Sequence, residues 1–306
     1  MSSALVARRP LAALIGAAAS WGIATVISKR AVEELSPLAL LAIQLGVSVI
    51  ALAVLLRIRG IPLRDPAASP LLSWLGVLNP GVAYLLSLIG LMSIDASLSV
   101  ILWALEPILI ILLAGAVLGE RIGGIGIGLS AAAILGVGLV AYEPTAAGAL
   151  TGVGLTIAGV GCCAVYTVAV RRWLGTANAT APVVLAQQVF ALAFVLPALL
   201  VASAIGNELG ALPTDVTTIG WLSAAISGVL YYAAAYWLYL SALRTLPASL
   251  AASSFFLIPI FGVAAAAILL TEQLAPAQWL GAAIVLAAVA SILRRPPPAL
   301  AAEPVG

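Results

Sequence analysis

The sequence places one acidic residue deep inside an apolar stretch. Glu106 stands about nine residues into the segment 97–118, which corresponds to about 14 Å along a helix. A carboxylate in such surroundings is costly and is usually functional when the segment crosses a membrane. Glu106 is therefore a candidate to bind a substrate ammonium group or to carry a proton. The alternative is a protonated carboxyl group that hydrogen-bonds to a neighbouring helix.

Neutral polar and aromatic residues in other apolar segments complete the candidate binding set. Amides and hydroxyls would hold a zwitterion without a full counter-charge, and aromatic rings would suit a bulky, weakly polar substrate. Interhelical hydrogen bonds are the alternative for the polar residues, and core packing or lipid contact is the alternative for the aromatic ones. Besides Glu106, the candidate substrate-binding residues are Trp21, Thr25, Asn79, Tyr84, Trp103, Tyr166, Gln187, Gln188, Tyr231, Tyr236, Trp237, Ser253 and Ser254.

The residues of common metal and catalytic sites are missing from the sequence. It contains no histidine, and its two cysteines, Cys162 and Cys163, are adjacent within an apolar run. Neighbouring side chains on a helix diverge, so we interpret this pair as packing residues rather than as a disulfide or a zinc site. The chain also has no embedded pair of acids and no glycine-rich phosphate loop. We expect no metal, no cofactor and no enzymatic activity.

Long apolar segments carry all the candidate residues. Of the 306 residues, 64% are hydrophobic and 8% are charged, against about 25% charged in a soluble domain. A helix that spans a bilayer needs about 20 apolar residues. The segments predict an all-α integral membrane protein with ten transmembrane helices. We expect the helices at residues 11–29, 37–56, 70–93, 97–118, 123–142, 150–170, 182–205, 218–241, 248–270 and 276–293.

The basic residues predict how these helices are oriented. With ten helices, eleven of the thirteen Lys and Arg side chains fall on the face that holds the termini, and only Lys29 and Arg30 fall on the other. The positive-inside rule then places both termini in the cytoplasm. Because Lys29 and Arg30 stand at a helix end, we expect their side chains to extend to the membrane interface.

One sequence pattern occurs twice, in the fourth and ninth predicted helices. It consists of Ala-Ser-Leu, then Pro, then Glu, and the second copy follows the first by 152 residues: Ala96-Ser97-Leu98, Pro107 and Glu120, then Ala248-Ser249-Leu250, Pro259 and Glu272. The copies are five helices apart, so they cross the membrane in opposite directions. Each proline removes a helical hydrogen bond, either for a packing kink alone or to turn a freed carbonyl group toward a cavity.

The repeat predicts a 5+5 inverted arrangement of the ten helices around a central cavity. Two such halves can exchange conformations and expose a site between them alternately to each side of the membrane. Glu106 aligns with Ile258 in the second copy, so the symmetry does not require its carboxylate. Glycines in Gly124-x-x-x-Gly128, and Gly152, Gly154, Gly159 and Gly161, are expected to allow close helix contact.

The repeated motif resembles the drug/metabolite transporter superfamily, and more closely its EamA-type exporters. The motif reads Glu106-Pro107-Ile108-Leu109 through Gly119-Glu120-Arg121, and Ile258-Pro259-Ile260-Phe261 through Thr271-Glu272-Gln273. Within the superfamily the chain most resembles the YddG-type aromatic amino-acid exporters of bacteria. The resemblance implies export of hydrophobic, aromatic and similar neutral amino acids across the bacterial inner membrane by alternating access.

The chain departs from one branch of this superfamily. Small multidrug-resistance proteins use an embedded glutamate in their first helix for proton exchange, and residues 11–28 here contain no acid. That mechanism is therefore not carried over. The second functional hypothesis is an exporter or importer of drugs or other small metabolites.

The predicted organisation has three parts. We expect a first five-helix repeat at residues 1–145, a second at 146–295, and a disordered Pro/Ala-rich cytoplasmic tail at 296–306. The expected partners are a small-molecule substrate, namely an amino acid or a related metabolite, and the lipid bilayer, with no nucleic acid. The sequence leaves both a monomer and a dimer open.

Overall fold

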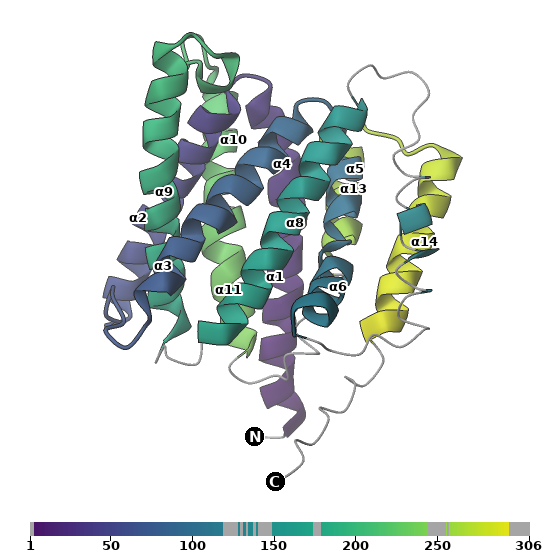
Figure 1. The fold of residues 1–306 in the computed structure, drawn as a ribbon, viewed down its shortest axis with the longest axis horizontal. Helices are drawn as coiled ribbons and strands as arrows, with labels where there is room; N and C mark the ends of the chain where they lie inside the picture. The colour runs from purple at the N-terminus through teal and green to yellow at the C-terminus, as the bar shows by residue number, and fades with distance from the viewer. Residues whose placement is uncertain are drawn as a thin grey trace.

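The chain forms a bundle of helices in its computed structural model (Figure 1). The structure describes residues 3–118, 149–173, 179–243, 255 and 257–293, with isolated positions between 128 and 139. Within these residues the secondary structure is helical and contains no strand. The elements are α1 (Ser3–Val32), α2 (Pro37–Ile58), α3 (Pro70–Gly76), η1 (Val77–Val82), α4 (Ala83–Leu91), α5 (Ala96–Trp103), α6 (Glu106–Leu118), α8 (Ala149–Trp173), α9 (Thr180–Ala204), η3 (Glu208–Gly210), α10 (Thr218–Gly228), η4 (Val229–Ala234), α11 (Ala235–Leu243), α13 (Leu257–Leu269) and α14 (Pro276–Leu293).

Six helical stretches in the described part of the chain are long and apolar enough to cross a membrane. They are Pro10–Val32, Pro37–Ile58, Pro70–Leu91, Leu150–Val170, Thr180–Ala204 and Thr218–Tyr239. Three shorter apolar helices accompany them, at Ala96–Ile110, Leu257–Leu269 and Pro276–Ala288. The expected span at 123–142 lies mostly outside the described residues, so the count of ten helices stays a prediction.

Several helices begin at residues whose chemistry favours a helix start. Pro37, Pro70 and Pro276 each occupy a first helical position, where the missing N–H needs no partner within the helix. Thr217 caps α10, since its hydroxyl accepts a hydrogen bond of 3.1 Å from the Gly220 N–H. Ser36 caps α2 in the same way, with the Ala39 N–H as donor.

The predicted proline kink of the fourth helix is a two-residue break in an otherwise helical stretch. α5 ends at Trp103, a turn follows at Ala104 and Leu105, and α6 restarts at Glu106. Pro107 is therefore the second residue of a new helix rather than an interior residue. The third predicted helix is interrupted differently, because Asn79 adopts extended torsions (φ −143°, ψ 114°) inside the π-helical η1, next to Pro80.

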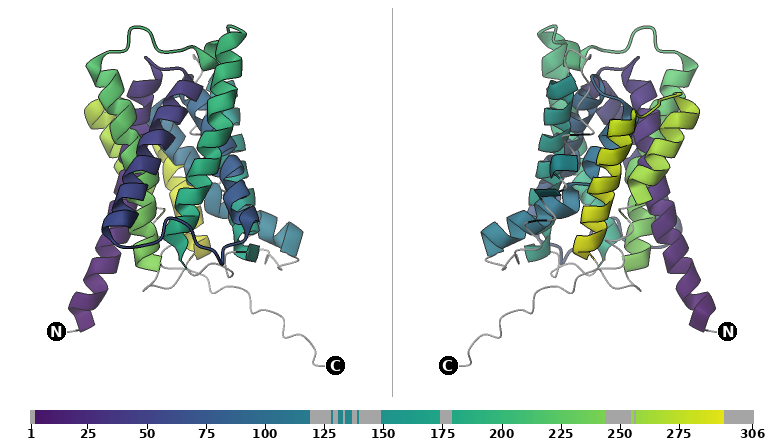
Figure 2. Two further views of the ribbon diagram at one scale, coloured as in Figure 1. Left: turned by 90° about the vertical axis from the view of Figure 1, so that its left-hand side faces the viewer. Right: turned by 90° about the vertical axis from the view of Figure 1, so that its right-hand side faces the viewer.

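The bundle has two ends, which we name by α1. The proximal face is the end where α1 begins, α2 ends and α3 begins. The distal face is the end where α1 ends and where α4 meets α5. Figure 2 shows the first turns of α1 extending beyond the rest of the bundle at the proximal face.

The first helix of each predicted repeat packs mainly on the other repeat. α1 contacts α10, α11 and α13, and α8 contacts α4, α5 and α6. α2 and α9 contact each other and connect the two groups. The helices therefore pack as two interleaved groups rather than as two separate halves.

Glycines set the closest of these contacts. A Cβ built at Gly152 of α8 would lie 2.8 Å from the Gly90 carbonyl oxygen of α4, and one at Gly159 would lie 2.5 Å from the Ala83 carbonyl oxygen. Gly154 and Gly161 face open space instead, as does Gly128. Gly124 lies outside the described residues. Close contact is thus confirmed for Gly152 and Gly159 and wrong for the other described glycines of the prediction.

The Lys29 side chain, which the sequence predicts to extend to the membrane interface, binds the end of α4. Its ammonium group donates hydrogen bonds of 2.8 Å to the Leu91 carbonyl and 2.9 Å to the Ile94 carbonyl. These acceptors follow the end of α4, where helical carbonyls lack partners and favour a cation. Arg30 does face the surface, where it pairs with Glu33 and lies 3.7 Å from Glu34.

Candidate functional site

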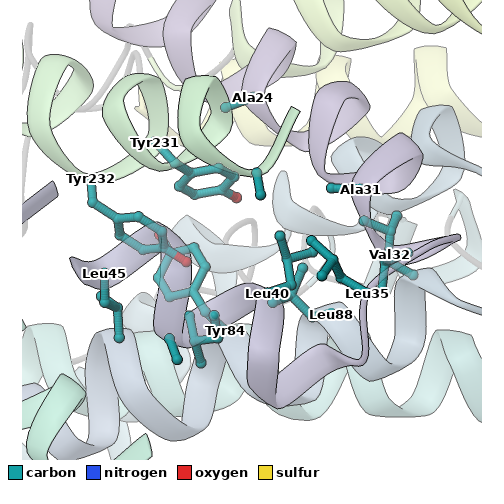
Figure 3. Close-up of a cluster of buried hydrophobic side chains, with 14 of the residues drawn as sticks. Ala24, Ala31, Val32, Leu35, Leu40, Leu45, Tyr84, Leu88, Tyr231 and Tyr232 are labelled. Carbon is teal, nitrogen blue, oxygen red and sulfur yellow. The ribbon is translucent and has the colours of Figure 1, made fainter. Parts of the chain in front are cut away.

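Four aromatic rings from three elements meet in the middle of the bundle. Tyr84 of α4 stacks on Trp103 of α5 with ring centroids 5.3 Å apart. Tyr84 also meets Tyr231 and Tyr232 of η4 edge-on, at 5.0 and 5.2 Å. Figure 3 shows the three tyrosine rings grouped together, with Leu45 beside them. Because both predicted repeats supply rings, this cluster lies where a site between them would be.

A small cavity opens beside this cluster. Its volume is about 20 Å³, which is room for one or two water molecules. Its lining combines hydroxyls, one amide and apolar side chains, and none of these lining residues is charged. They are Thr25, Ser28, Gln44, Tyr84, Ser87, Leu88, Leu91, Tyr231 and Tyr232.

The polar groups of the cavity form a network with one open position. The Gln44 amide donates to the Ser28 hydroxyl at 2.9 Å and to the Ser227 hydroxyl at 2.8 Å. The Thr25 hydroxyl donates to the Tyr231 hydroxyl at 3.4 Å. The Gln44 side-chain oxygen is buried and has no hydrogen-bond partner among the described residues. A donor group entering the cavity, from water or from a ligand, would satisfy it.

Glu106 lies near the same centre. It is the first residue of α6, it is partly exposed, and it makes no hydrogen bond or ion pair within the described part of the chain. It follows Trp103, a ring of the aromatic cluster, by three residues. The start of a helix also favours a negative charge. Glu106 therefore offers a carboxyl group near an otherwise uncharged cavity.

A second aromatic cluster surrounds Trp21. The Trp21 ring packs edge-on against Tyr236 at 5.5 Å, Tyr239 at 5.7 Å and Phe255 at 5.5 Å. Trp21 stands one helical turn before Thr25 on α1, so this cluster adjoins the cavity on its proximal side. The indole Nε1 of Trp21 is buried without a partner among the described residues.

The two consecutive glutamines of α9 hydrogen-bond to neighbouring helices. Gln187 accepts from the Tyr166 hydroxyl at 2.8 Å and donates to the Leu72 carbonyl at 2.9 Å. Gln188 accepts from the Ser48 hydroxyl at 2.6 Å and donates to the Tyr232 carbonyl at 3.1 Å. These contacts hold α9 against its neighbours, as the alternative of interhelical bonding predicts.

The remaining candidates lie apart from the cavity lining. Asn79 is buried in η1, and its side-chain oxygen has no partner among the described residues. Trp237 lies under the Arg59 guanidinium, 5.1 Å from its ring centroid, and Arg59 caps the proximal end of α2. Ser253 and Ser254 lie outside the described residues.

Six of the nine lining residues are absent from the predicted set of binding residues, namely Ser28, Gln44, Ser87, Leu88, Leu91 and Tyr232. Ser28 follows Thr25 by three positions, Ser87 follows Tyr84 by three, and Tyr232 adjoins Tyr231. Residues three apart share a helix face, so this spacing was the available signal for the two serines. No group of three or more His, Cys, Asp or Glu side chains that could hold a metal occurs in the described part of the chain.

Comparison with known proteins identifies the family of the chain. The model of the EamA-like transporter family matches twice, at residues 9–142 and 150–294. No curated protein matches the chain. A crystal structure shares the fold with a TM-score of 0.64 and 19% sequence identity, covering 94% of this chain and 98% of that one.

Proposed function

Because the chain belongs to the EamA-like transporter family, we propose that it exports neutral amino acids, above all hydrophobic and aromatic ones, by alternating access across the bacterial inner membrane. The family membership makes the chain a multi-pass membrane transporter of small molecules. Beyond the family membership, we propose the amino-acid substrate, the direction of transport and the bacterial inner membrane as the location.

The observation that carries this proposal is the composition of the central site. Its rings supply apolar faces for a bulky side chain, and its amide and hydroxyls supply neutral donors and acceptors. Glu106, three residues after Trp103 of the aromatic cluster, would attract a substrate ammonium group when ionised. A zwitterion with a neutral side chain matches these three features together.

Alternating access accounts for the small size of the cavity. A cavity of about 20 Å³ cannot hold an amino acid, so the arrangement corresponds to a closed form of the site. Its walls come from α1, α2, α4 and η4, which belong to both repeats. A relative movement of the two groups of helices would enlarge it.

Flux measurements on the purified full chain in proteoliposomes test the proposal. Vesicles would be loaded in turn with phenylalanine, tryptophan, leucine, lysine and glutamate, and with a hydrophobic organic cation. We expect saturable movement of the neutral amino acids, fastest for the aromatic ones, and slower movement of the charged ones. If no amino acid moves saturably above empty liposomes, the proposal is wrong. Saturable movement of the organic cation alone would favour a drug carrier.

A further inference from the structure

Two charged side chains hold the turn between α4 and α5 at the distal face. Lys29 of α1 donates to the Leu91 and Ile94 carbonyls at 2.8 and 2.9 Å, where α4 ends. Glu272, which follows α13, accepts hydrogen bonds of 2.9 Å from the N–H groups of both Ala96 and Ser97, where α5 begins. Each charge has the sign that the helix end favours.

Thr271, the residue before Glu272, has a strained backbone in the conformation that directs the Glu272 carboxylate to the start of α5. Thr271 has φ 56°, in the left-handed region that a β-branched residue rarely adopts. Such strain persists only where surrounding contacts maintain it, and it concentrates at switch regions. The hydrogen bonds of Glu272 to α5 are contacts of this kind.

The two groups that meet here belong to different parts of the bundle. α1 packs on α10, α11 and α13, and α4 packs chiefly on α8, whereas α5 packs on both α13 and α8. Lys29 of α1 and Glu272, which follows α13, both hydrogen-bond to the turn between α4 and α5. The Lys29 contacts therefore join α1 to the end of α4, across the interface whose opening alternating access requires, and the Glu272 contacts hold the start of α5 to the segment after α13.

The Lys29 contacts also adjoin the cavity. Ser28 and Leu91 line it, Lys29 is the residue after Ser28, and the Leu91 carbonyl accepts the Lys29 hydrogen bond. We propose that Lys29 and Glu272 form the distal gate of the transporter. When both release the α4–α5 turn, the cavity opens to the distal face. This inference rests on the proposed transport cycle but not on the identity of the substrate.

Thiol labelling of a cavity residue tests the gate without any substrate. The full chain, with Cys162→Ala and Cys163→Ala, would carry Leu88→Cys as a reporter, because Leu88 lines the cavity and is 5% exposed. Intact cells would be treated with a membrane-impermeant thiol reagent, which reaches the distal face because the basic residues predict the opposite, proximal face to be cytoplasmic. We expect Lys29→Met and Glu272→Gln each to speed labelling by about tenfold, because each removes hydrogen bonds to a charged group.

A matched control comes from the next residue. Arg30→Met removes a cation from the same end of α1, but Arg30 binds Glu33 at the surface, so its labelling rate should equal that of the parent. Lys29→Arg should restore slow labelling if its guanidinium reaches the same carbonyls.

Two results would overturn the gate. One is parental labelling in both Lys29→Met and Glu272→Gln, in protein that elutes and melts as the parent does. The other is an equal acceleration in Arg30→Met. Glu272→Gln keeps the size of the side chain, so it remains informative if Lys29→Met does not fold. Fast labelling in the gate variants without amino-acid flux would support the gate and refute the proposed substrate.

Discussion

Glu106 combines a place within an apolar segment, partial exposure and the lack of a hydrogen-bond or ion-pair partner within the described residues. A carboxylate held only for structure would be expected to meet a donor on a neighbouring helix, as Gln187 and Gln188 meet theirs. The position of Glu106 at the start of α6, beside the aromatic cluster, instead leaves it open to a mobile cation or a proton.

Glu106→Gln should slow the transport of neutral amino acids without a large loss of stability. The substitution keeps the shape of the side chain and removes the charge, so saturable flux should fall by about tenfold or more, the scale of a lost charge-assisted contact. Its dependence on pH should also change. The measurement is proteoliposome flux over a range of pH, with the Tm in detergent as the folding control. Wild-type kinetics at every pH would assign Glu106 to structure.

Glu34 lies at the distal surface, outside the apolar spans, and joins the end of α1 to the start of α10. Hydrogen bonds from the Thr217 backbone N–H and hydroxyl lower the pKa of Glu34 below its usual value of 4.5, and the nearby Arg30 charge acts in the same direction. A depressed pKa means that the folded state prefers the ionised carboxylate. Its contribution to stability is therefore full above pH 4.5 and is lost as the pH falls through the lower folded pKa.

Glu34→Gln should therefore lower the Tm at neutral pH and have little effect at strongly acidic pH. The Tm difference between wild type and variant should shrink as the pH drops below 4.5. Glu33→Gln is the control, because Glu33 makes an exposed pair with Arg30 and such pairs contribute little. A Tm difference that stays constant across this pH range would show that the ionised Glu34 carboxylate is not what stabilises the fold.

At the scale of the helices, the length of an apolar segment predicts the position of a helix better than any single residue does. The segment expected at 37–56 is the helix Pro37–Ile58, and the one expected at 218–241 continues to Leu243. The interruptions within the helices are harder to predict from the sequence. Pro107 predicts a kink. Whether the helix bends there or starts again depends on the packing around Ala104 and Leu105, which cannot be read from a single sequence.

The candidate site shows the same limit. Burial, polarity and aromatic character pointed to Thr25, Tyr84, Trp103 and Tyr231, which the fold brings together. They did not separate these residues from Trp237, because the distinction depends on which helix lies opposite. Partners contributed by distant segments, such as the Leu72 carbonyl for Gln187, exist only in the folded chain.

The α4–α8 contact allows a matched test of helix packing. A methyl group added at Gly152 would meet the backbone of Gly90, which cannot move cheaply, whereas one added at Gly154 would meet no atom within 4 Å. Gly152→Ala should therefore destabilise the protein by about 1–3 kcal/mol. Gly154→Ala should be neutral or stabilising by up to about 1 kcal/mol, since alanine favours a helix.

Thermal unfolding of both variants in detergent provides the measurement. Equal Tm values for Gly152→Ala and Gly154→Ala would mean that α4 and α8 are not packed as closely as these contacts require. The comparison is internal, because the two glycines lie on the same helix two residues apart and differ in what they face.

At the scale of the whole molecule, the predicted inverted repeat and the interleaved packing have one consequence in common. Each repeat contributes its first helix to the opposite group, so neither group can move without the other repeat being involved. The distal gate uses Glu272 on Ala96 and Ser97, which are residues of the motif that occurs twice. In the other copy the same positions are Glu120, Ala248 and Ser249, which lie outside the described residues.

The repeat therefore predicts opposite effects for the two glutamates. If both copies serve as gates on opposite faces, Glu272→Gln should speed labelling of Leu88→Cys from the outside of intact cells. Glu120→Gln should instead speed labelling in inside-out vesicles and slow it from the outside, because weakening one gate shifts the population toward the state that closes the other. Labelling rates from both sides measure this shift directly. Two gates related by an inverted repeat lie on opposite faces, so the two substitutions should speed labelling from opposite sides. Faster labelling from the same side in both variants would show that the repeated glutamates are not a pair of gates.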